Sequence, residues 1–206
     1  MATAPTGTRR RGTPQAERRA QTRAALLDAT IESLVTHGYA RTTTGRIAEL
    51  AGVSRGAQLS YFASRSELLI AAVAHLSEKR IAEFTARVGA RSPSLEECLD
   101  ALWAGVQAPL FDAALELWVA ARTDPELRTA MLRFEREIGG AIFAAAESAL
   151  GDAARRPGFG EDLLHALAVV RGVALLQVTT GASPRTIERQ WAHAREQLLQ
   201  LLGSTG

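Results

Sequence analysis

Two polar side chains that can read DNA bases, Arg55 and Gln58, stand three residues apart. Residues at this spacing share one face of an α-helix. In the major groove of DNA, arginine can donate two hydrogen bonds to guanine, and glutamine can pair with adenine. The pair therefore indicates base recognition by a helix that presents both side chains outward. The alternative is a helical hairpin with a solvated basic surface.

Groups that can bind phosphate flank this pair. Thr43 and Ser54 each precede a predicted short helix, as N-cap residues do, and the free N–H groups at such helix starts can bind phosphate. Arg18, Arg19 and Arg23 could follow the DNA backbone or enter a minor groove. The predicted DNA contacts are Thr43, Thr44, Arg46, Ser54, Arg55, Ala57, Gln58, Ser60, Tyr61 and Arg65.

Two short helices joined by a turn at Gly52 must position these residues. Helices of under ten residues are not stable alone, so we expect them to pack on the helix predicted over residues 15–37. Such a three-helix unit presents its last helix to the major groove. The shared core is predicted to contain Ile47, Ala48, Ala51, Val53 and Leu59 or Phe62.

The rest of the chain shows helical periodicity and no segment of useful length that alternates with period two. We predict an all-α fold of about nine helices. Charge is uneven along it: residues 1–66 hold ten arginines and four acidic residues, whereas residues 67–206 hold fourteen basic and eighteen acidic residues. This asymmetry indicates that one end meets a polyanion. Residues 1–14 are predicted to be a disordered basic arm.

The sequence shows no recognised catalytic or metal-binding motif. Cys98 is the single cysteine, which excludes an internal disulfide, and the four histidines show no metal-ligand spacing. We expect no enzyme activity, cofactor or metal. No targeting signal is visible, and the apolar stretch over residues 163–178 is judged too interrupted, by His165, Arg171 and Gln177, to span a bilayer. A cytoplasmic location is expected.

Residues 23–69 resemble the DNA-binding domain of the tetracycline-repressor (TetR) family. The matching features are Gly38-Tyr39, Thr43, Ile47-Ala48, the run from Ala51 to Gly56, Tyr61-Phe62, Arg65 and Leu68. The chain departs from the family pattern at Gln58-Leu59, where Leu-Tyr is frequent, and at Tyr61, where His is frequent. Leu59 cannot replace the phosphate hydrogen bond of that tyrosine. The resemblance implies that residues 15–66 bind DNA and that helical residues 67–206 bind a small effector and form a homodimer.

Residues for these last two roles can be proposed from the pattern. The pocket candidates, each of which could instead be ordinary core, are Trp103, Gln107, Phe111, Trp118, Phe134, Phe143, Arg171 and Gln177. Arg171 needs an anionic ligand or a carboxylate partner, and an ion pair is the preferred reading. The dimer-interface candidates, which could instead pack within one subunit, are Leu163, Leu167, Val170, Ala174, Ile187, Trp191, Ala194 and Leu198.

The sequence thus predicts a ligand-responsive, DNA-binding transcriptional regulator. The favoured form is a homodimeric repressor that a small molecule releases from a palindromic operator. An activator, or a ligand-independent regulator of the same fold, is the first alternative. A helical enzyme or partner-binding protein with an incidental basic N-terminus is the remote one.

Overall fold

The computed structural model describes residues 14–88 and 93–203, and in these ranges the chain forms nine α-helices, one short 3-10 helix and no strand. The predicted all-α class is therefore confirmed. The basic arm predicted over residues 1–14 lies outside the described residues, except that Pro14 begins the first helix. The helices are α1 (Pro14–Arg41), α2 (Thr44–Leu50), α3 (Arg55–Tyr61), α4 (Arg65–Val88), α5 (Leu95–Val106), α6 (Pro109–Ala121), α7 (Pro125–Leu150), η1 (Gly151–Arg155), α8 (Phe159–Thr180) and α9 (Pro184–Gly203).

Polar side chains cap the helix starts largely where the sequence placed them. Ser94 and Glu97 form a reciprocal capping box at the start of α5. At the start of α4, Ser64 Oγ accepts a hydrogen bond from the Glu67 N–H, but the Glu67 carboxylate accepts its bond from the Ala63 N–H, 2.7 Å away. The second bond of this box therefore goes to the residue before the N-cap, and not to the N-cap residue as in α5. Both arrangements satisfy N–H groups that a helix start leaves without partners.

Gly38 interrupts α1 at the position where the sequence predicted a helix end. Its φ of 74° and ψ of 171° are not helical, and positive φ strains residues that carry a side chain. The next N–H, that of Tyr39, donates to Glu116 Oε2 on α6 over 2.5 Å. A Cβ atom at Gly38 would lie 3.2 Å from the same oxygen. Glycine therefore allows the kink and the close approach of α6 together.

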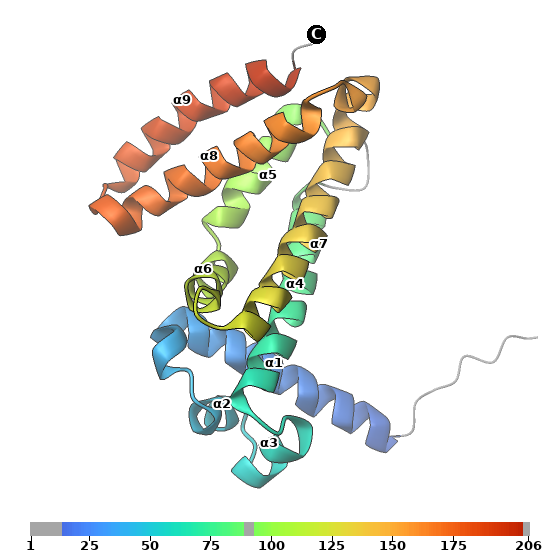
Figure 1. Ribbon diagram of the computed structural model, residues 1–206, viewed down its shortest axis with the longest axis vertical. Coiled ribbons are helices and arrows are strands. Elements are labelled where there is room, and N and C mark those ends of the chain that lie inside the picture. Colours follow the sequence, from blue (N-terminus) through green and yellow to red (C-terminus); the bar gives the residue numbers. More distant parts are fainter. Residues whose placement is uncertain (1–13, 89–92, 204–206) are drawn as a thin grey trace, which may run out of the picture.

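The helices form an elongated molecule with α1–α3 at one end and the antiparallel pair α8 and α9 near the other (Figure 1). The long helices α4 and α7 pack along each other between these ends, with α5 and α6 beside them. A small core holds the α1–α3 end together and includes Leu26, Ile47, Phe62, Leu68 and Ala72. Leu68 and Ala72 belong to α4. The same helix contributes Leu69, Val73 and Leu76 to the larger core of the remaining helices.

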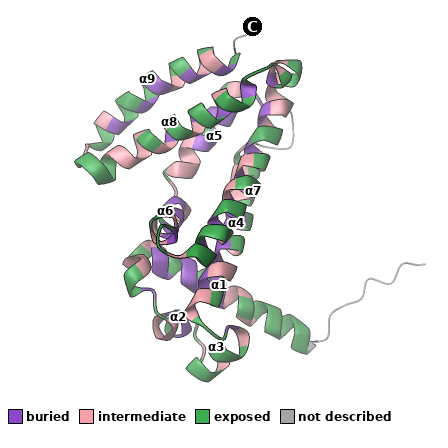
Figure 2. Cartoon of the chain, in the orientation of Figure 1, coloured by how far each residue is buried: buried purple, intermediate pink, exposed green. Residues whose placement is uncertain are grey.

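Helix α8 is long and apolar enough to cross a membrane by length and composition, and no other helix of the described residues is. One helix that meets this criterion is weak evidence for a membrane span, because the criterion considers length and composition only. Only 17% of its most apolar window is buried in the subunit, and exposed positions are visible along it in Figure 2. An apolar helix face of this kind requires a cover.

Candidate nucleic-acid interface

Helices α2 and α3 form a compact pair against α1. Thr43 Oγ1 accepts from the Arg46 N–H, and Ser54 Oγ accepts from the Ala57 N–H, so both predicted N-caps are present. The turn between the helices contains Gly52 at φ 66°, and the Val53 N–H returns to the Ala48 carbonyl at 2.9 Å. Seven-residue helices depend on such packing for their stability, which fixes the direction of α3.

The outward face of α3 carries Arg55, Leu59 and Ser60. Leu59 is 57% exposed, and Arg55 lies one turn before it on the same face. Among the described residues, no acceptor lies within hydrogen-bond distance of the Arg55 guanidinium, so its donors are available to a ligand. Of the predicted contacts, Thr43, Ser54, Arg55 and Ser60 are exposed, and Thr44, Arg46, Ala57 and Tyr61 are half-buried.

The predicted outward orientation of Gln58 is wrong. Its side chain is 1% exposed, and its Nε2 donates to the carbonyl of Phe62 over 3.2 Å. This bond satisfies a carbonyl just beyond the end of α3, where helical partners are lacking. Gln58 therefore stabilises α3 from inside, and the large apolar side chain that α3 exposes is that of Leu59.

Arg65 makes contacts within the subunit that the sequence did not predict. Its Nε donates to the Thr42 carbonyl over 2.8 Å, one of its terminal nitrogens donates to the Tyr39 carbonyl over 2.7 Å, and its guanidinium lies 4.3 Å from the centre of the Tyr39 ring. These contacts tie the start of α4 to the segment between α1 and α2. Arg65 therefore sets the position of the helix pair.

Two arginines of α1 lie beside α3, which supports their assignment to the interface. The guanidinium of Arg19 lies 5.2 Å from the centre of the Tyr61 ring. That of Arg23 lies 5.4 Å from the centre of the Phe62 ring. Both residues are exposed. The positive charge of α1 is thereby added to that of Arg55 at one end of the molecule, where a polyanion would gain most from it.

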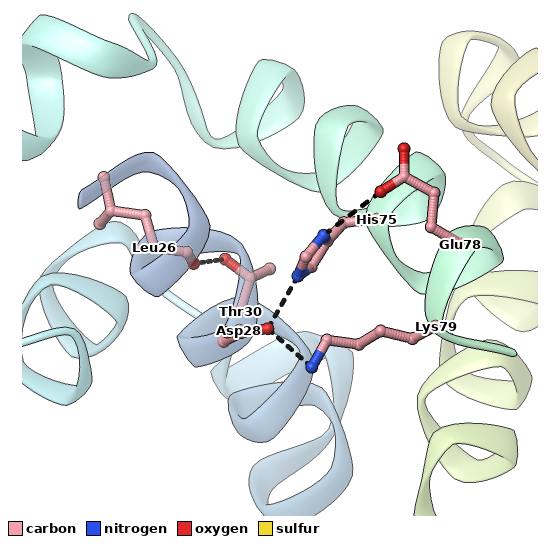
Figure 3. A network of polar contacts seen from close by, with 6 residues as sticks. All are labelled: Leu26, Asp28, Thr30, His75, Glu78 and Lys79. Carbon is pink, nitrogen blue, oxygen red and sulfur yellow. Dashed lines mark hydrogen bonds and ion pairs between the residues drawn. The ribbon is translucent and has the colours of Figure 1, made fainter. Parts of the chain in front are cut away.

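A polar network joins α1 to α4 (Figure 3). Asp28 Oδ1 on α1 lies 2.7 Å from His75 Nε2 and 2.9 Å from Lys79 Nζ, both on α4. Burial raises the pKa of the Asp28 carboxyl, but hydrogen bonds from Lys79 and His75 outweigh it and hold the pKa below its ordinary value. The carboxylate is therefore stabilised as an anion that connects the two helices.

The predicted pocket residues fall into separate groups. Phe111, Trp118 and Phe134 meet edge to face, with ring centres 5.6 Å and 6.3 Å apart along the series. Trp103 instead stacks on Trp191 of α9 at 4.6 Å, and Phe143 packs against Phe159. Gln107 and Gln177 are exposed. The structure therefore does not bring the eight predicted pocket residues together around one cavity.

Arg171 has the carboxylate partner that the sequence favoured. Its guanidinium donates to Glu135 Oε2 over 2.8 Å and lies 4.9 Å from the centre of the Trp118 ring. Trp118 Nε1 donates to the other oxygen of the same carboxylate over 2.9 Å. The predicted ion pair is confirmed, and it connects α6, α7 and α8.

A cavity that the sequence did not predict lies between α4, α5 and α7. It holds about 30 Å³ and is lined by Arg80, Ile81, Glu83, Phe84, Arg87, Ala101, Leu102, Gly105, Ile138, Ala141 and Ile142. None of the eight predicted pocket residues lines it. Phe134 lines an open groove between α4 and α7, and Phe143 and Arg171 line another between α7 and α8. The spacing of residues along one helix does not reveal such spaces between helices.

Most of the predicted dimer contacts pack inside the subunit. Leu163 and Val170 of α8 and Ile187, Trp191, Ala194 and Leu198 of α9 are buried, while Leu167 and Ala174 are half-buried. The buried six are wrong as surface contacts, because α8 and α9 pack against each other and against α5, where Trp191 stacks on Trp103. The apolar side chains that α8 leaves uncovered include Leu164 at 68% exposure and Val178 at 71%.

The described residues contain no cluster of three or more His, Cys, Asp or Glu side chains that could hold a metal ion. Cys98 is buried in α5, and burial, with a smaller effect of Glu97, raises the pKa of its thiol to about 11. At that pKa the nucleophilic thiolate is scarce at neutral pH. Cys98 therefore has the properties of a packing residue.

Comparison with known proteins places this interface in a family. The family model described as "Bacterial regulatory proteins, tetR family" matches residues 26–72, from α1 into α4. The HTH-type transcriptional regulator Rv2912c of Mycobacterium tuberculosis is 33% identical over 141 residues, which cover 66% of this chain and 72% of that protein. The HTH-type transcriptional regulator CymR of Pseudomonas putida is 34% identical over 122 residues, covering 58% and 60%.

Solved structures share the fold. A TetR transcription regulator from Haloarcula marismortui superposes with a TM-score of 0.71 at 21% identity, covering 89% of this chain and 97% of that one. The multidrug binding protein EbrR, solved with imidazole, gives 0.63 at 22% identity, covering 89% and 96%. The exposed basic face of α3, the family match that contains it and the mycobacterial relative lead to one conclusion: this chain belongs to the tetR family of bacterial regulatory proteins and is a DNA-binding transcriptional regulator.

Proposed function

We propose that the protein is a homodimeric repressor that leaves a palindromic operator when a small effector binds among residues 67–206. The observation that carries the proposal is the outward face of α3, with Arg55 available and Arg19 and Arg23 beside it. In this arrangement Arg55 would read guanine, and the N–H groups at the starts of α2 and α3 would meet phosphate. Arg46 and Tyr61 would lie at the edge of that contact.

The exposed face of α8 supports the dimer. Leu164 and Val178 are large apolar side chains that the subunit leaves uncovered, and pairing α8 and α9 with a second copy would form a four-helix interface. A two-fold protein matches a two-fold operator, with two copies of α3 in successive major grooves. This cover also accounts for an apolar α8 without a membrane.

Helix α4 supports the coupling of effector to DNA. It contributes Leu68 and Ala72 to the core of the α1–α3 end, and its other end lines the cavity through Arg80 and Phe84. We place the boundary between the DNA-binding and effector domains at the start of this helix, after residue 66. An effector that favours another position of α4 changes the spacing of the two recognition helices, provided that it binds the two states with different affinity.

The test is fluorescence anisotropy on the DNA upstream of the protein's own gene, against scrambled DNA, at two salt concentrations. We expect a preference of ~10³-fold or more for the operator. Arg55→Ala should weaken operator binding ~5- to 150-fold, as the loss of one bidentate base contact does. The matched control Arg133→Ala removes an exposed arginine of α7 and should change nothing. Equal, strongly salt-dependent binding to both DNAs, and to DNA fragments selected from the whole genome, would contradict the proposal.

A further inference from the structure

Arg80 places a positive charge in the apolar cavity between α4, α5 and α7. Most of the other lining residues are aliphatic or aromatic, among them Ile81, Phe84, Leu102 and Ile138. Apolar pockets with one or a few placed polar groups are typical of small-molecule sites. The charge of this cavity therefore indicates the chemistry of its ligand.

Arg80 has few partners of its own. One terminal nitrogen donates to the Gly105 carbonyl at the end of α5 over 2.6 Å, and the guanidinium lies 5.9 Å from the centre of the Phe111 ring. Among the described residues, no carboxylate oxygen lies within 4 Å of its nitrogens. A guanidinium has five N–H donors, so the protein leaves most of them unused. The one buried side-chain nitrogen or oxygen without a partner in the described residues belongs to Arg156. The unused donors of Arg80 are therefore accessible to solvent and to a ligand.

Keeping this charge in place is costly for the apoprotein. Burial lowers the pKa of Arg80. Glu83 and, to a smaller extent, Glu135 only partly oppose this effect, and Arg171 and Arg87 add to it. The ionisable groups of the cavity wall are Arg80, Glu83 and Arg87, which leave it with a net positive charge. A partly buried cation is stabilised by a desolvated anion that accepts its free donors.

We propose that the effector is an apolar carboxylate whose oxygens accept hydrogen bonds from Arg80 while its hydrocarbon body lies against Ile81, Phe84 and Ile138. This inference rests on the proposed function, because it names the ligand class of the effector domain. A bidentate guanidinium–carboxylate pair would fix the head group, and the apolar wall would favour a hydrocarbon tail.

The size of the cavity connects binding to DNA release. At about 30 Å³ it has room for about one water molecule, so we expect a carboxylate with a hydrocarbon tail to move α4 away from α5 or α7. Lys79, the neighbour of Arg80, and His75 hold Asp28 of α1 from the same helix (Figure 3). A displaced α4 therefore takes the DNA-binding end with it.

The experiment compares straight-chain carboxylates from butanoate to dodecanoate with the primary alcohols of the same length, by calorimetry on the full-length protein. We expect the best carboxylate to bind at least ~10-fold more tightly than its matched alcohol, since charge-assisted hydrogen bonds are the stronger kind. Arg80→Met should remove this preference, and Arg80→Lys should retain part of it. Arg133→Met, in the open groove between α4 and α7, should retain all of it.

Equal affinity for acids and alcohols, binding of neither series up to millimolar concentration, or an unchanged preference in Arg80→Met would each overturn the inference. Circular dichroism checks that the variants are folded, and Arg80→Lys serves if Arg80→Met is not. Operator binding is measured in the same samples without ligand. If the wild-type protein binds its operator specifically but shows no preference for carboxylates, only the proposed ligand class is refuted. If the wild-type protein does not bind DNA specifically, the proposed function is refuted.

Discussion

At the scale of single residues, α3 divides its side chains between holding the helix and meeting DNA. Arg55 and Gln58 share the spacing of neighbours, but Gln58 is turned toward the Phe62 carbonyl and Arg55 is not. Spacing predicts which residues lie close together; it does not determine which side of a seven-residue helix faces the core. The family pattern was the available signal for the orientation of α3. It often places leucine at position 58 and a phosphate-binding tyrosine at position 59.

The two residues should accordingly fail in different ways. Gln58→Ala removes a buried hydrogen bond and leaves the Phe62 carbonyl without its partner, so we expect a loss of ~1–3 kcal/mol in the free energy of unfolding. Arg55→Ala should leave that free energy within ~0.5 kcal/mol of the wild type while weakening operator binding. Urea denaturation and anisotropy on the same preparations measure both quantities. Equal stability of the two variants would show that Gln58 is not a structural residue.

We expect the exposed Leu59 to meet base edges, and the methyl group of thymine is the apolar feature of the major groove. We expect that replacing thymine with uracil at one or more positions of each half-site weakens binding by the wild type. Leu59→Ala should remove the difference between the two bases at those positions. A double-mutant cycle between the methyl group and the leucine, followed by anisotropy, isolates the contact. Additive effects at every thymine would exclude it.

At the scale of elements, local patterns predicted helices and caps well because their causes are local. Thr43, Ser54 and the pair Ser94–Glu97 cap helices through bonds that span three residues. The cavity at Arg80 and the burial of the α8 and α9 stripes depend instead on how helices meet, and no spacing within one helix encodes that. Arg171 was an intermediate case, because a charge in an apolar helix requires a partner whatever its position in the sequence.

The connection between α1 and α4 should depend on pH through Asp28. Its pKa is lowered in the folded state, so its contribution to stability is present above the ordinary value of about 3.8 and is lost as the pH falls through the lowered value. Asp28 is half exposed, which limits the contribution to ~1 kcal/mol or less. Asp28→Asn should be less stable than the wild type at pH 7 and equal to it near pH 2, by urea denaturation. Glu32→Gln, an exposed change on the same helix, is the control.

The kink of α1 allows a second prediction at this scale. Gly38→Ala would place a Cβ atom at positive φ and 3.2 Å from Glu116 Oε2, so we expect a loss of ~1 kcal/mol or more in the free energy of unfolding. Gly139→Ala, at a helical glycine of α7 with nothing within 4 Å of the added atom, should be neutral or stabilising. Thermal denaturation of both variants measures these changes. A Gly38→Ala protein as stable as the wild type would show that the contact between α1 and α6 can relax.

At the scale of the whole molecule, the proposed dimer depends on the exposed apolar face of α8. Leu164→Glu should give a monomer of native helix content that has lost most of its operator affinity, because a charge in the proposed interface has no partner. Val119→Glu, an equally exposed apolar position of α6, should remain dimeric. Light scattering after size exclusion measures the mass, and a Leu164→Glu dimer would contradict the proposed interface.

The same separation of ends, with α3 far from α8 and α9 (Figure 1), has a genetic consequence. A subunit with a defective recognition helix would still pair normally and would draw intact subunits into mixed dimers with one working half. In a cell that carries both alleles, the α3 mutant should therefore be dominant over the wild type. An α8 mutant that cannot pair should be recessive, because it leaves the wild-type subunits to one another.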